Sequence, residues 1–318
     1  MLEIVTSKAP AIHVANLYKS YGSAHVLNGV NLELEQGEFY ALMGPNGSGK
    51  STLSAIIASV VNFDGGTVQV FGLKPTEAKK LLGYVPQDNF SIPLLTCREN
   101  LVYFAGLLGY YGENARAMAD QLLSKVGLAT DANKRASQCS GGMRKKLELA
   151  TALFPGIKLL ILDEPTTGLD PSARREFFDL VKNTVDQGTS ILLVTHLGSD
   201  AEQAKRVGLM FKGAIVAEGS PEALKRKYAT VDVITVETNI RNQQVANLLE
   251  GYCTDGKLAE TQNGYHIYTH DGAELVPKII HALDRIGISE KSIGVSTATL
   301  EDVFFHVTEH PMHEVSQQ

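Results

Sequence analysis

The sequence contains few cysteines, and their spacing excludes two kinds of protein. The three residues, Cys97, Cys139 and Cys253, lie far apart and form no CxxC pair. This pattern rules out a disulfide scaffold and a four-cysteine zinc site. It fits a protein of the reducing cytosol.

Long apolar runs are also missing. The longest one outside the expected strands is LVYFAGLLGYY, residues 101–111, and a membrane-spanning helix needs about 20 apolar residues. The N-terminus, MLEIVTSKAP, lacks the charged start and apolar stretch of a signal peptide. We therefore expect a cytoplasmic chain that reaches a membrane only through a partner.

The chain has no excess of positive charge. It carries 29 Lys and Arg against 35 Asp and Glu, a net charge of −6, and it has no basic block. This balance argues against a nucleic-acid partner. With 318 residues, of which 44% are hydrophobic and 20% charged, the chain has ordinary globular composition and a length that suggests two domains.

Strand and helix patterns alternate in the first two thirds of the chain. Residues 11–35 predict antiparallel strands with Gly22, Gly29 and Gly37 near turns. Residues 39–43, 157–163 and 190–196 are apolar runs typical of a parallel sheet covered on both faces. Residues 171–188 predict a helix with Pro171 at its start, and residues from about 94 to 150 predict an inserted helical subdomain. The alternation favours an α/β layer fold.

A second unit is predicted to begin near residue 230. Residues 207–217 predict a hairpin that turns at Lys212 and Gly213, and Ser220 and Pro221 open a short helix ending near Tyr228. The segments that follow predict the order βαββαβ, which is a ferredoxin-like pattern. A short helix over residues 300–307 comes after the last strand.

The segment GPNGSGKST has the spacing of a phosphate-binding loop, with a strand before it and a helix after it. Its glycines let the backbone approach closely and direct N–H groups at phosphate oxygens. Lys50 can reach the β- and γ-phosphates, and Ser51 can offer its hydroxyl to Mg²⁺. The predicted nucleotide-binding residues here are Gly44, Pro45, Asn46, Gly47, Ser48, Gly49, Lys50, Ser51 and Thr52.

Two carboxylates end the apolar run LLILDEP. Asp163 and Glu164 fall at the carboxyl end of a predicted strand, where open α/β sheets bind their ligands. Asp163 suits Mg²⁺, a hard cation that prefers oxygen. Glu164 is a candidate general base that would activate water for attack on the γ-phosphate. Together with the phosphate loop, these residues indicate a P-loop NTPase.

Further motifs narrow this class. The order is Tyr21, GPNGSGKST, Gln87 in YVPQD, SGGM at residues 140–143, LLILDEP, GLD at 168–170 and His196. This order resembles the ATP-binding-cassette ATPases over residues 10 to 225. Here Cys139 and Met143 stand where the signature LSGGQ of that family has Leu and Gln. SGGM and the C-terminal TLEDVFFHVTE look like exporter ATPases that serve a separate membrane permease.

The resemblance implies roles at four positions. Tyr21 would stack on adenine. Gln87 would sense the γ-phosphate or Mg²⁺ and link to the helical subdomain, and His196 would hydrogen-bond the γ-phosphate. Asp170 would lie at a dimer interface, or it would cap the helix that begins at Pro171, and both roles can hold.

The resemblance also implies partners. ATP would be sandwiched in a head-to-tail homodimer, or a heterodimer with a sister ATPase, with Ser140, Gly141 and Gly142 of one subunit facing the phosphate loop of the other. The dimer would sit on the inner face of the cell membrane, bound to its permease. The apolar residues that follow Gln87, together with residues 101–111, are expected mostly to pack the helical subdomain. A few of their side chains, with Phe90 and Tyr103 as candidates, would dock the permease. An importer ATPase subunit and a soluble, non-transport cassette ATPase are the alternatives.

We expect a P-loop NTPase fold of the ABC type over residues 10–228, with an antiparallel β subdomain and a helical subdomain. A small α+β ferredoxin-like domain follows over residues 230–310. The expected activity is hydrolysis of ATP, with Mg²⁺ as cofactor.

Overall fold

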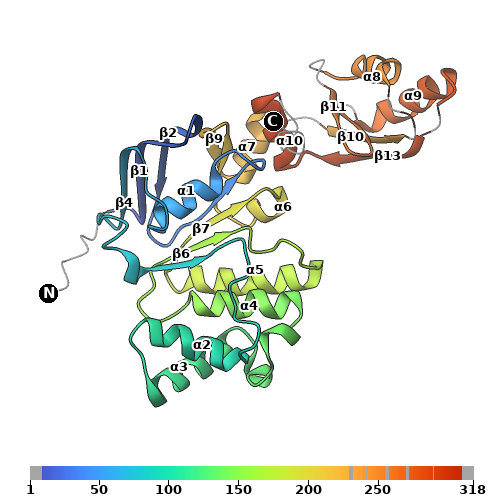
Figure 1. The fold of residues 1–318 in the computed structure, drawn as a ribbon. Coiled ribbons are helices and arrows are strands. Elements are labelled where there is room, and N and C mark those ends of the chain that lie inside the picture. Colours follow the sequence, from blue (N-terminus) through green and yellow to red (C-terminus); the bar gives the residue numbers. More distant parts are fainter. Residues whose placement is uncertain are drawn as a thin grey trace.

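The computed structural model describes residues 9–228, 232–238, 240, 242–254, 258–269, 272–288 and 290–309. A six-stranded sheet lies at the centre of the first part (Figure 1). Its strands, in spatial order, are β5 (Leu82–Val85), β6 (Leu159–Asp163), β7 (Ser190–Thr195), β3 (Phe39–Met43), β8 (Arg206–Phe211) and β9 (Ala214–Gly219). The first five strands pair in parallel, and β9 is antiparallel to β8 across the predicted hairpin turn.

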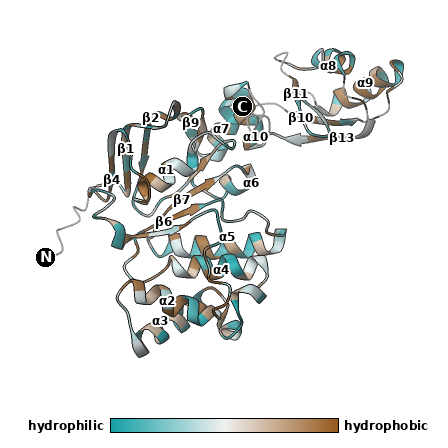
Figure 2. Ribbon diagram, in the orientation of Figure 1, coloured by the Kyte–Doolittle hydropathy of each residue, from teal (hydrophilic) through white to brown (hydrophobic). Residues whose placement is uncertain are grey.

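Both faces of this sheet are covered. Every residue of β3, β6 and β7 is buried, and Figure 2 shows hydrophobic colouring along β6 and β7. On β3, Tyr40 and Leu42 join the core that contains α1 (Lys50–Ile57). Ala41 and Met43 join the core that contains α5 (Pro171–Asp186). Because successive side chains of a strand point to opposite faces, one apolar run stabilises both layers. The predicted α/β fold is confirmed.

A three-stranded antiparallel sheet covers α1. Its order is β2 (Ala24–Leu34), β1 (Ile12–Tyr21) and β4 (Gly65–Val70). Gly22 lies in the turn between β1 and β2, as predicted, but placing Gly29 near a turn was wrong. Gly29 lies inside β2 with φ +73°, where the pairing with β1 is irregular around Leu17 and Tyr18. A Cβ at Gly29 would lie 3.0 Å from the Tyr18 hydroxyl, so the glycine serves a bulge.

The region between β5 and β6 is helical, as predicted. It contains α2 (Cys97–Leu107), α3 (Gly112–Lys125) and α4 (Gly141–Thr151), which share their own apolar core. Cys97 and Cys139 meet inside it, with their Sγ atoms 3.6 Å apart, although no disulfide joins them. Their wide spacing in sequence therefore did not mean separation in space.

The C-terminal part has the predicted order βαββαβ. It consists of β10 (Asp232–Thr238), α8 (Gln243–Glu250), β11 (Leu258–Glu260), β12 (Gly264–Thr269), α9 (Gly272–Arg285) and β13 (Glu290–Thr297). The strands form an antiparallel sheet in the order β11-β12-β10-β13, which packs its own core against both helices. The predicted domain limits at residues 230 and 310 lie outside the described residues.

Three further short α-helices lie in the described residues. They are α6 (Gly198–Ala201), α7 (Pro221–Tyr228) and α10 (Leu300–Thr308). Figure 1 shows α10 returning from β13 to lie beside α7. No helix in the described residues is long and apolar enough to span a bilayer.

Candidate active site

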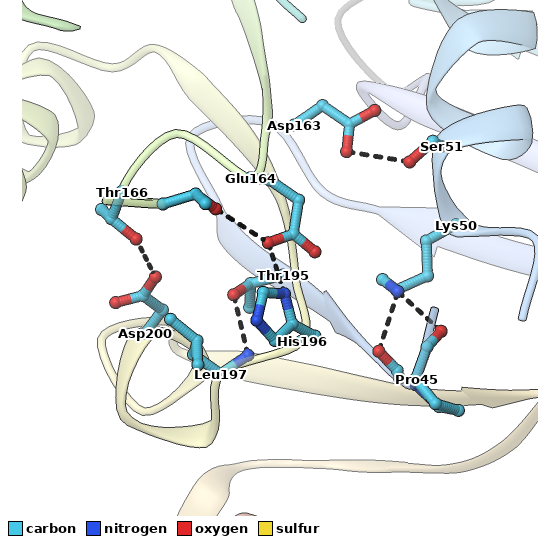
Figure 3. Close-up of polar contacts among 12 residues, drawn as sticks. Pro45, Lys50, Ser51, Asp163, Glu164, Thr166, Thr195, His196, Leu197 and Asp200 are labelled. Carbon is cyan, nitrogen blue, oxygen red and sulfur yellow. Dashed lines mark hydrogen bonds and ion pairs between the residues drawn. The ribbon is translucent and has the colours of Figure 1, made fainter. Parts of the chain in front are cut away.

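The predicted site residues follow three neighbouring strands and lie at one edge of the sheet. β7 lies between β3 and β6, and all three strands run in the same direction. The phosphate loop follows β3, Glu164 follows β6 and His196 follows β7. Figure 3 shows Lys50, Ser51, Asp163, Glu164 and His196 grouped at this edge. The carboxyl edge of a parallel sheet is where such folds bind ligands.

Close packing shapes the phosphate loop. A Cβ on Gly44 would lie 2.2 Å from the Met210 carbonyl oxygen. Gly49 has φ +103°, and a Cβ there would lie 2.8 Å from the Val26 carbonyl oxygen. Glycine is therefore required at both positions, by contact with the neighbouring strands and, at Gly49, also by backbone conformation.

The loop presents unpaired polar groups. Within the described residues, the N–H groups of Asn46, Gly47 and Gly49 donate to no protein acceptor. The Ser48 hydroxyl is buried without a hydrogen-bond partner. Buried polar groups rarely stay unpaired in native proteins, so this loop is suited to an anion. The cradle fits the phosphates of a nucleotide.

Lys50 places its ammonium inside the same loop. Its Nζ atom donates to the carbonyl oxygens of Gly44 at 2.8 Å and Pro45 at 2.9 Å. Burial lowers the pKa of Lys50, although Glu164 and Asp163 nearby oppose this shift. The carbonyl groups thus hold a cation where negative phosphate charge is expected. Thr52 is the third residue of α1 and is half-buried.

Asp163 faces the start of α1. Its carboxylate accepts hydrogen bonds from the Ser51 hydroxyl at 3.1 Å and from the Ser54 hydroxyl at 3.0 Å. Burial raises the pKa of Asp163 against the opposing effect of these bonds. In the described residues no cluster of three or more His, Cys, Asp or Glu could hold a metal ion. One carboxylate beside a hydroxyl still suits Mg²⁺, which takes few protein ligands and binds nucleotide phosphates.

Ser54 is absent from the sequence-based prediction. It lies three residues after Ser51, and residues at that spacing share a face of a helix. Since Ser51 was predicted to face the Mg²⁺ site, the spacing alone could have placed Ser54 beside Asp163.

Glu164 and His196 form a close pair. The His196 Nδ1 atom lies 2.5 Å from Glu164 Oε2 in an ion-pair contact (Figure 3). The same oxygen accepts a hydrogen bond from the Thr167 hydroxyl at 3.3 Å. Glu164 is almost fully buried and has φ +50°, a left-handed conformation that is unusual for glutamate. Such strained residues cluster at active sites. The pair brings a candidate base and an orienting imidazole together.

A hydrogen-bond network braces the loop after His196. The Thr195 hydroxyl accepts from the Leu197 amide at 3.0 Å. Asp200, which is fully buried, accepts hydrogen bonds from the Thr166 hydroxyl and from the Arg174 guanidinium. Thr166 follows Glu164 by two residues, so the Glu164 and His196 loops are tied to each other. No sequence motif indicated this network.

Gln87 and Tyr21 lie on exposed segments. Gln87 follows β5 with its side chain exposed, and its backbone carbonyl accepts from the Lys145 ammonium on α4 at 3.4 Å. The Gln87 segment is therefore linked to the helical region. Tyr21 ends β1 with half of its surface exposed, and the Lys19 ammonium lies 5.2 Å from the ring centroid. An accessible ring of this kind can stack on a base.

The SGGM residues lie at a separate place. Ser140 caps α4, with its hydroxyl accepting from the Met143 amide at 3.2 Å, and Gly141 and Gly142 form the first turn. In the described residues no hydrogen bond or ion pair joins these three residues to the phosphate loop. A single chain therefore does not bring the two predicted phosphate-binding segments together.

Asp170 caps α5. Its carboxylate accepts from the amides of Ser172 and Ala173, both at 3.0 Å, and Pro171 occupies the first helical position. The capping role is thus present. The side chain is exposed and can also meet a second subunit.

Sequence comparisons place this site in a known family. Residues 27–167 match the ABC transporter family. A daunorubicin resistance ATP-binding protein of Streptomyces coeruleorubidus is 34% identical, over 94% of this chain and 96% of the relative. A Nod factor export ATP-binding protein I of Burkholderia orbicola is 37% identical, over 72% of this chain and 77% of the relative.

A solved structure agrees with these relatives. A dimeric ATP-binding cassette in a post-hydrolysis state, bound to ADP and Pi, has 29% identity and a TM-score of 0.61. The match covers 66% of this chain and 98% of that one. The similarity to the daunorubicin resistance relative also covers the C-terminal part of this chain. The chain therefore belongs to the family of ABC transporter ATP-binding subunits, and it is an ATPase that binds and hydrolyses ATP.

Proposed function

We propose that this chain hydrolyses Mg²⁺-bound ATP at the edge formed by β3, β6 and β7, and that it powers export through a separate membrane permease. The Glu164–His196 pair beside the phosphate loop is the observation that supports the catalytic part of this proposal. Glu164 acts as the general base, because its carboxylate is buried and lies at the same edge as Lys50. His196 orients that carboxylate and hydrogen-bonds the γ-phosphate.

The loop after β3 binds the phosphates. Backbone N–H groups and the N-terminus of α1 hold the negative charge, and Lys50 turns from the Gly44 and Pro45 carbonyls toward the β- and γ-phosphates. Tyr21 supports the adenine ring. Ser51, Asp163 and Gln87 would hold Mg²⁺, which when bound would neutralise negative charge on the phosphates. The Ser51–Asp163 hydrogen bond supports this assignment for two of the three.

The second half of the site comes from another subunit in this proposal. Ser140, Gly141 and Gly142 open α4 and lack contact with the phosphate loop of their own chain. A helix N-terminus attracts phosphate, so a head-to-tail partner that presents these residues completes the cage around the γ-phosphate. The partner is a second copy or a sister ATPase, and Asp170 lies at the interface. The dimeric cassette structure supports this arrangement.

Exposed apolar side chains on α2 and just after it support a permease contact. Tyr103, Leu107, Leu108 and Tyr111 are 49%, 67%, 52% and 72% exposed, whereas Leu101 and Ala105 are buried. Phe90 is half-buried and packs edge-to-face on Phe104, 5.6 Å between centroids, so it belongs mainly to the core. We assign Tyr103 and its exposed neighbours to the docking surface. The chain would then lie on the inner face of the membrane.

The direction of transport rests on the relatives. The proteins compared above are named for drug resistance and for Nod factor export, and the exporter assignment extends those names to this chain. It is favoured over the importer and the soluble-cassette alternatives for that reason.

Phosphate release from purified protein with ATP, with and without Mg²⁺, tests the catalytic part. Glu164→Gln should abolish release while the protein still binds ATP and forms a stable dimer in size-exclusion chromatography. Release that persists in Glu164→Gln would contradict the assignment of the base. The same variant, used with ATP and Mg²⁺ as bait in detergent-solubilised membranes, should retain a multi-span permease. Ribosomal or DNA-repair proteins in its place would contradict the transport role.

A further inference from the structure

Helix α10 connects the C-terminal sheet to the ATPase core. Leu300, Val303 and Phe304 are fully buried in the same apolar cluster as Leu224 of α7. The Phe304 ring also packs edge-to-face on Phe211 of β8, with centroids 5.7 Å apart. The helix is therefore part of the core of the first domain, although it follows the last strand of the second.

Two successive acidic residues on α10 face different partners. Asp302 is buried and accepts hydrogen bonds from the Tyr268 hydroxyl at 2.7 Å and from the Thr299 hydroxyl at 2.7 Å, and His266 Nδ1 lies 3.4 Å away. Tyr268 and His266 belong to β12. Asp302 thus fixes α10 to the C-terminal sheet.

Glu301 reaches in the other direction. Its Oε1 atom accepts a hydrogen bond of 2.6 Å from the amide of Gly198, the first residue of α6. Gly198 follows His196 by two residues. A carboxylate that accepts from a backbone amide at a helix start makes a strong, charge-assisted hydrogen bond. The C-terminal part therefore holds the loop that carries His196.

The identity of residue 198 fits this contact. A Cβ at Gly198 would lie 2.1 Å from Oε2 and 2.5 Å from Cδ of Glu301. The glutamate carboxylate thus occupies the space that any larger residue would need. The φ of Gly198 is not positive, so its backbone would accept alanine.

The contact adds an anchor to a loop that the first domain also holds. The Thr195 hydroxyl binds the Leu197 amide, and Asp200 binds Thr166 and Arg174. The Arg174 guanidinium also donates to the Ser199 hydroxyl at 2.7 Å, so these contacts lie on both sides of Gly198. Glu301 holds Gly198, two residues after the histidine whose imidazole meets Glu164.

We propose that Glu301 is a positioning residue for ATP hydrolysis, which fixes the His196 loop through the Gly198 amide and makes turnover depend on the C-terminal part. The inference rests on the proposed role of His196. Glu301 does not touch the phosphate loop, so its loss should slow turnover without weakening ATP binding. We expect Glu301→Ala to lower kcat about tenfold, with KM for ATP changed less than about twofold.

Glu301→Ala, Gly198→Ala and the double variant form a double-mutant cycle, measured in the full-length protein. Glu301→Ala removes the acceptor, and Gly198→Ala pushes the carboxylate away without changing the charge of the protein. If both act through one hydrogen bond, each should lower kcat, and the double variant should be no slower than the worse single variant. Glu301→Gln keeps an acceptor oxygen and should recover part of the lost rate. Glu222→Ala, on exposed surface of the neighbouring α7, is the matched control and should keep the normal rate.

The outcomes separate this inference from the proposed function. Activity is measured at least 15 °C below the thermal unfolding midpoint of each variant, so that unfolding does not contribute. A normal kcat in Glu301→Ala, or additive losses in the double variant, would overturn the positioning role. His196→Ala is measured in parallel, and a normal rate there would instead overturn the proposed role of the histidine.

Discussion

His196 Nδ1 lies 2.5 Å from Glu164 Oε2, although the two residues follow different strands and are 32 positions apart in the sequence. The contact exists because β6 and β7 are neighbours and end at the same edge. His196→Ala should therefore lower kcat by at least about 100-fold, since Glu164 loses the group that orients it. Affinity for a non-hydrolysable ATP analogue, measured by calorimetry, should fall by no more than about tenfold, because one hydrogen bond to the γ-phosphate is lost while the phosphate loop still holds the nucleotide.

The chain offers a matched control for this histidine. His13 lies 3.4 Å from Glu33, another His–Glu pair, on the exposed surface of the β1–β2 sheet. His13→Ala should retain the full ATPase rate. Equal losses in the two variants would refute a specific role of His196.

Gly142 is expected to be far more sensitive to substitution than Gly141. A Cβ on Gly142 would lie 2.9 Å from the Cβ of Ala173 on α5, whereas the nearest atom to one on Gly141 is 3.8 Å away. Gly142→Ala should lower the free energy of unfolding by about 1–3 kcal/mol, because it forces α4 and α5 apart. Gly141→Ala should change it by less than about 0.5 kcal/mol. Urea unfolding measures both, and equal effects would contradict this packing.

The two buried cysteines should react slowly with thiol reagents. Burial, together with the neighbouring Cys139 thiol, raises the pKa of the Cys97 thiol to about 12. Only the thiolate reacts, so maleimide labelling of the native protein at pH 7.5 should modify Cys253, which is half-buried, at least about tenfold faster. All three cysteines should label together in urea. Rapid modification of Cys97 in the native protein, read by peptide mass spectrometry, would contradict this prediction.

Asp302 should stabilise the protein in a pH-dependent manner. Burial opposes ionisation, but hydrogen bonds from His266, Thr299 and Tyr268 outweigh it and lower the pKa of Asp302. A lowered pKa in the folded state means that the ionised form stabilises the fold above the unfolded value, near 3.8, and that this contribution is lost as the pH falls through the folded value.

Asp302→Asn should therefore lower the free energy of unfolding by about 2 kcal/mol at pH 7. The difference from the parent chain should shrink as the pH falls below about 4. Urea unfolding at several pH values measures it, with the exposed Asp284→Asn on α9 as the control. A difference that stays constant down to pH 3 would show that the charge is not involved.

Local patterns were enough to predict most of the strands, the phosphate loop and the ends of several helices, but they did not predict β4 or β5. The apolar runs at 39–43 and 190–196 correspond to β3 and β7, and Asp170 with Pro171 correctly marked the start of α5. These features depend on burial periodicity and on capping, which are properties of neighbouring residues. Gly29 was misplaced because a glycine required by a bulge looks the same in sequence as a glycine in a turn.

Contacts between distant segments could not be predicted in this way. Cys97 meets Cys139, Thr166 meets Asp200, and Glu301 meets Gly198 only because the fold brings separate elements together. No periodicity or spacing encodes such pairs. The roles of Tyr21, Gln87 and the SGGM residues toward ATP are predictions. The structure of the proposed dimer with ATP bound would test them.

The place of β3 in the sheet determines when the site can form during synthesis. This strand carries the phosphate loop near the start of the chain, yet its two neighbours are β7 and β8. A nascent chain cannot complete this pairing until Leu209 has been made. Loop closure over such a long separation is slow, and it leaves the apolar strand FYALM without its partners in the meantime. Nucleotide binding should therefore appear late in translation, in one step with the closure of the sheet.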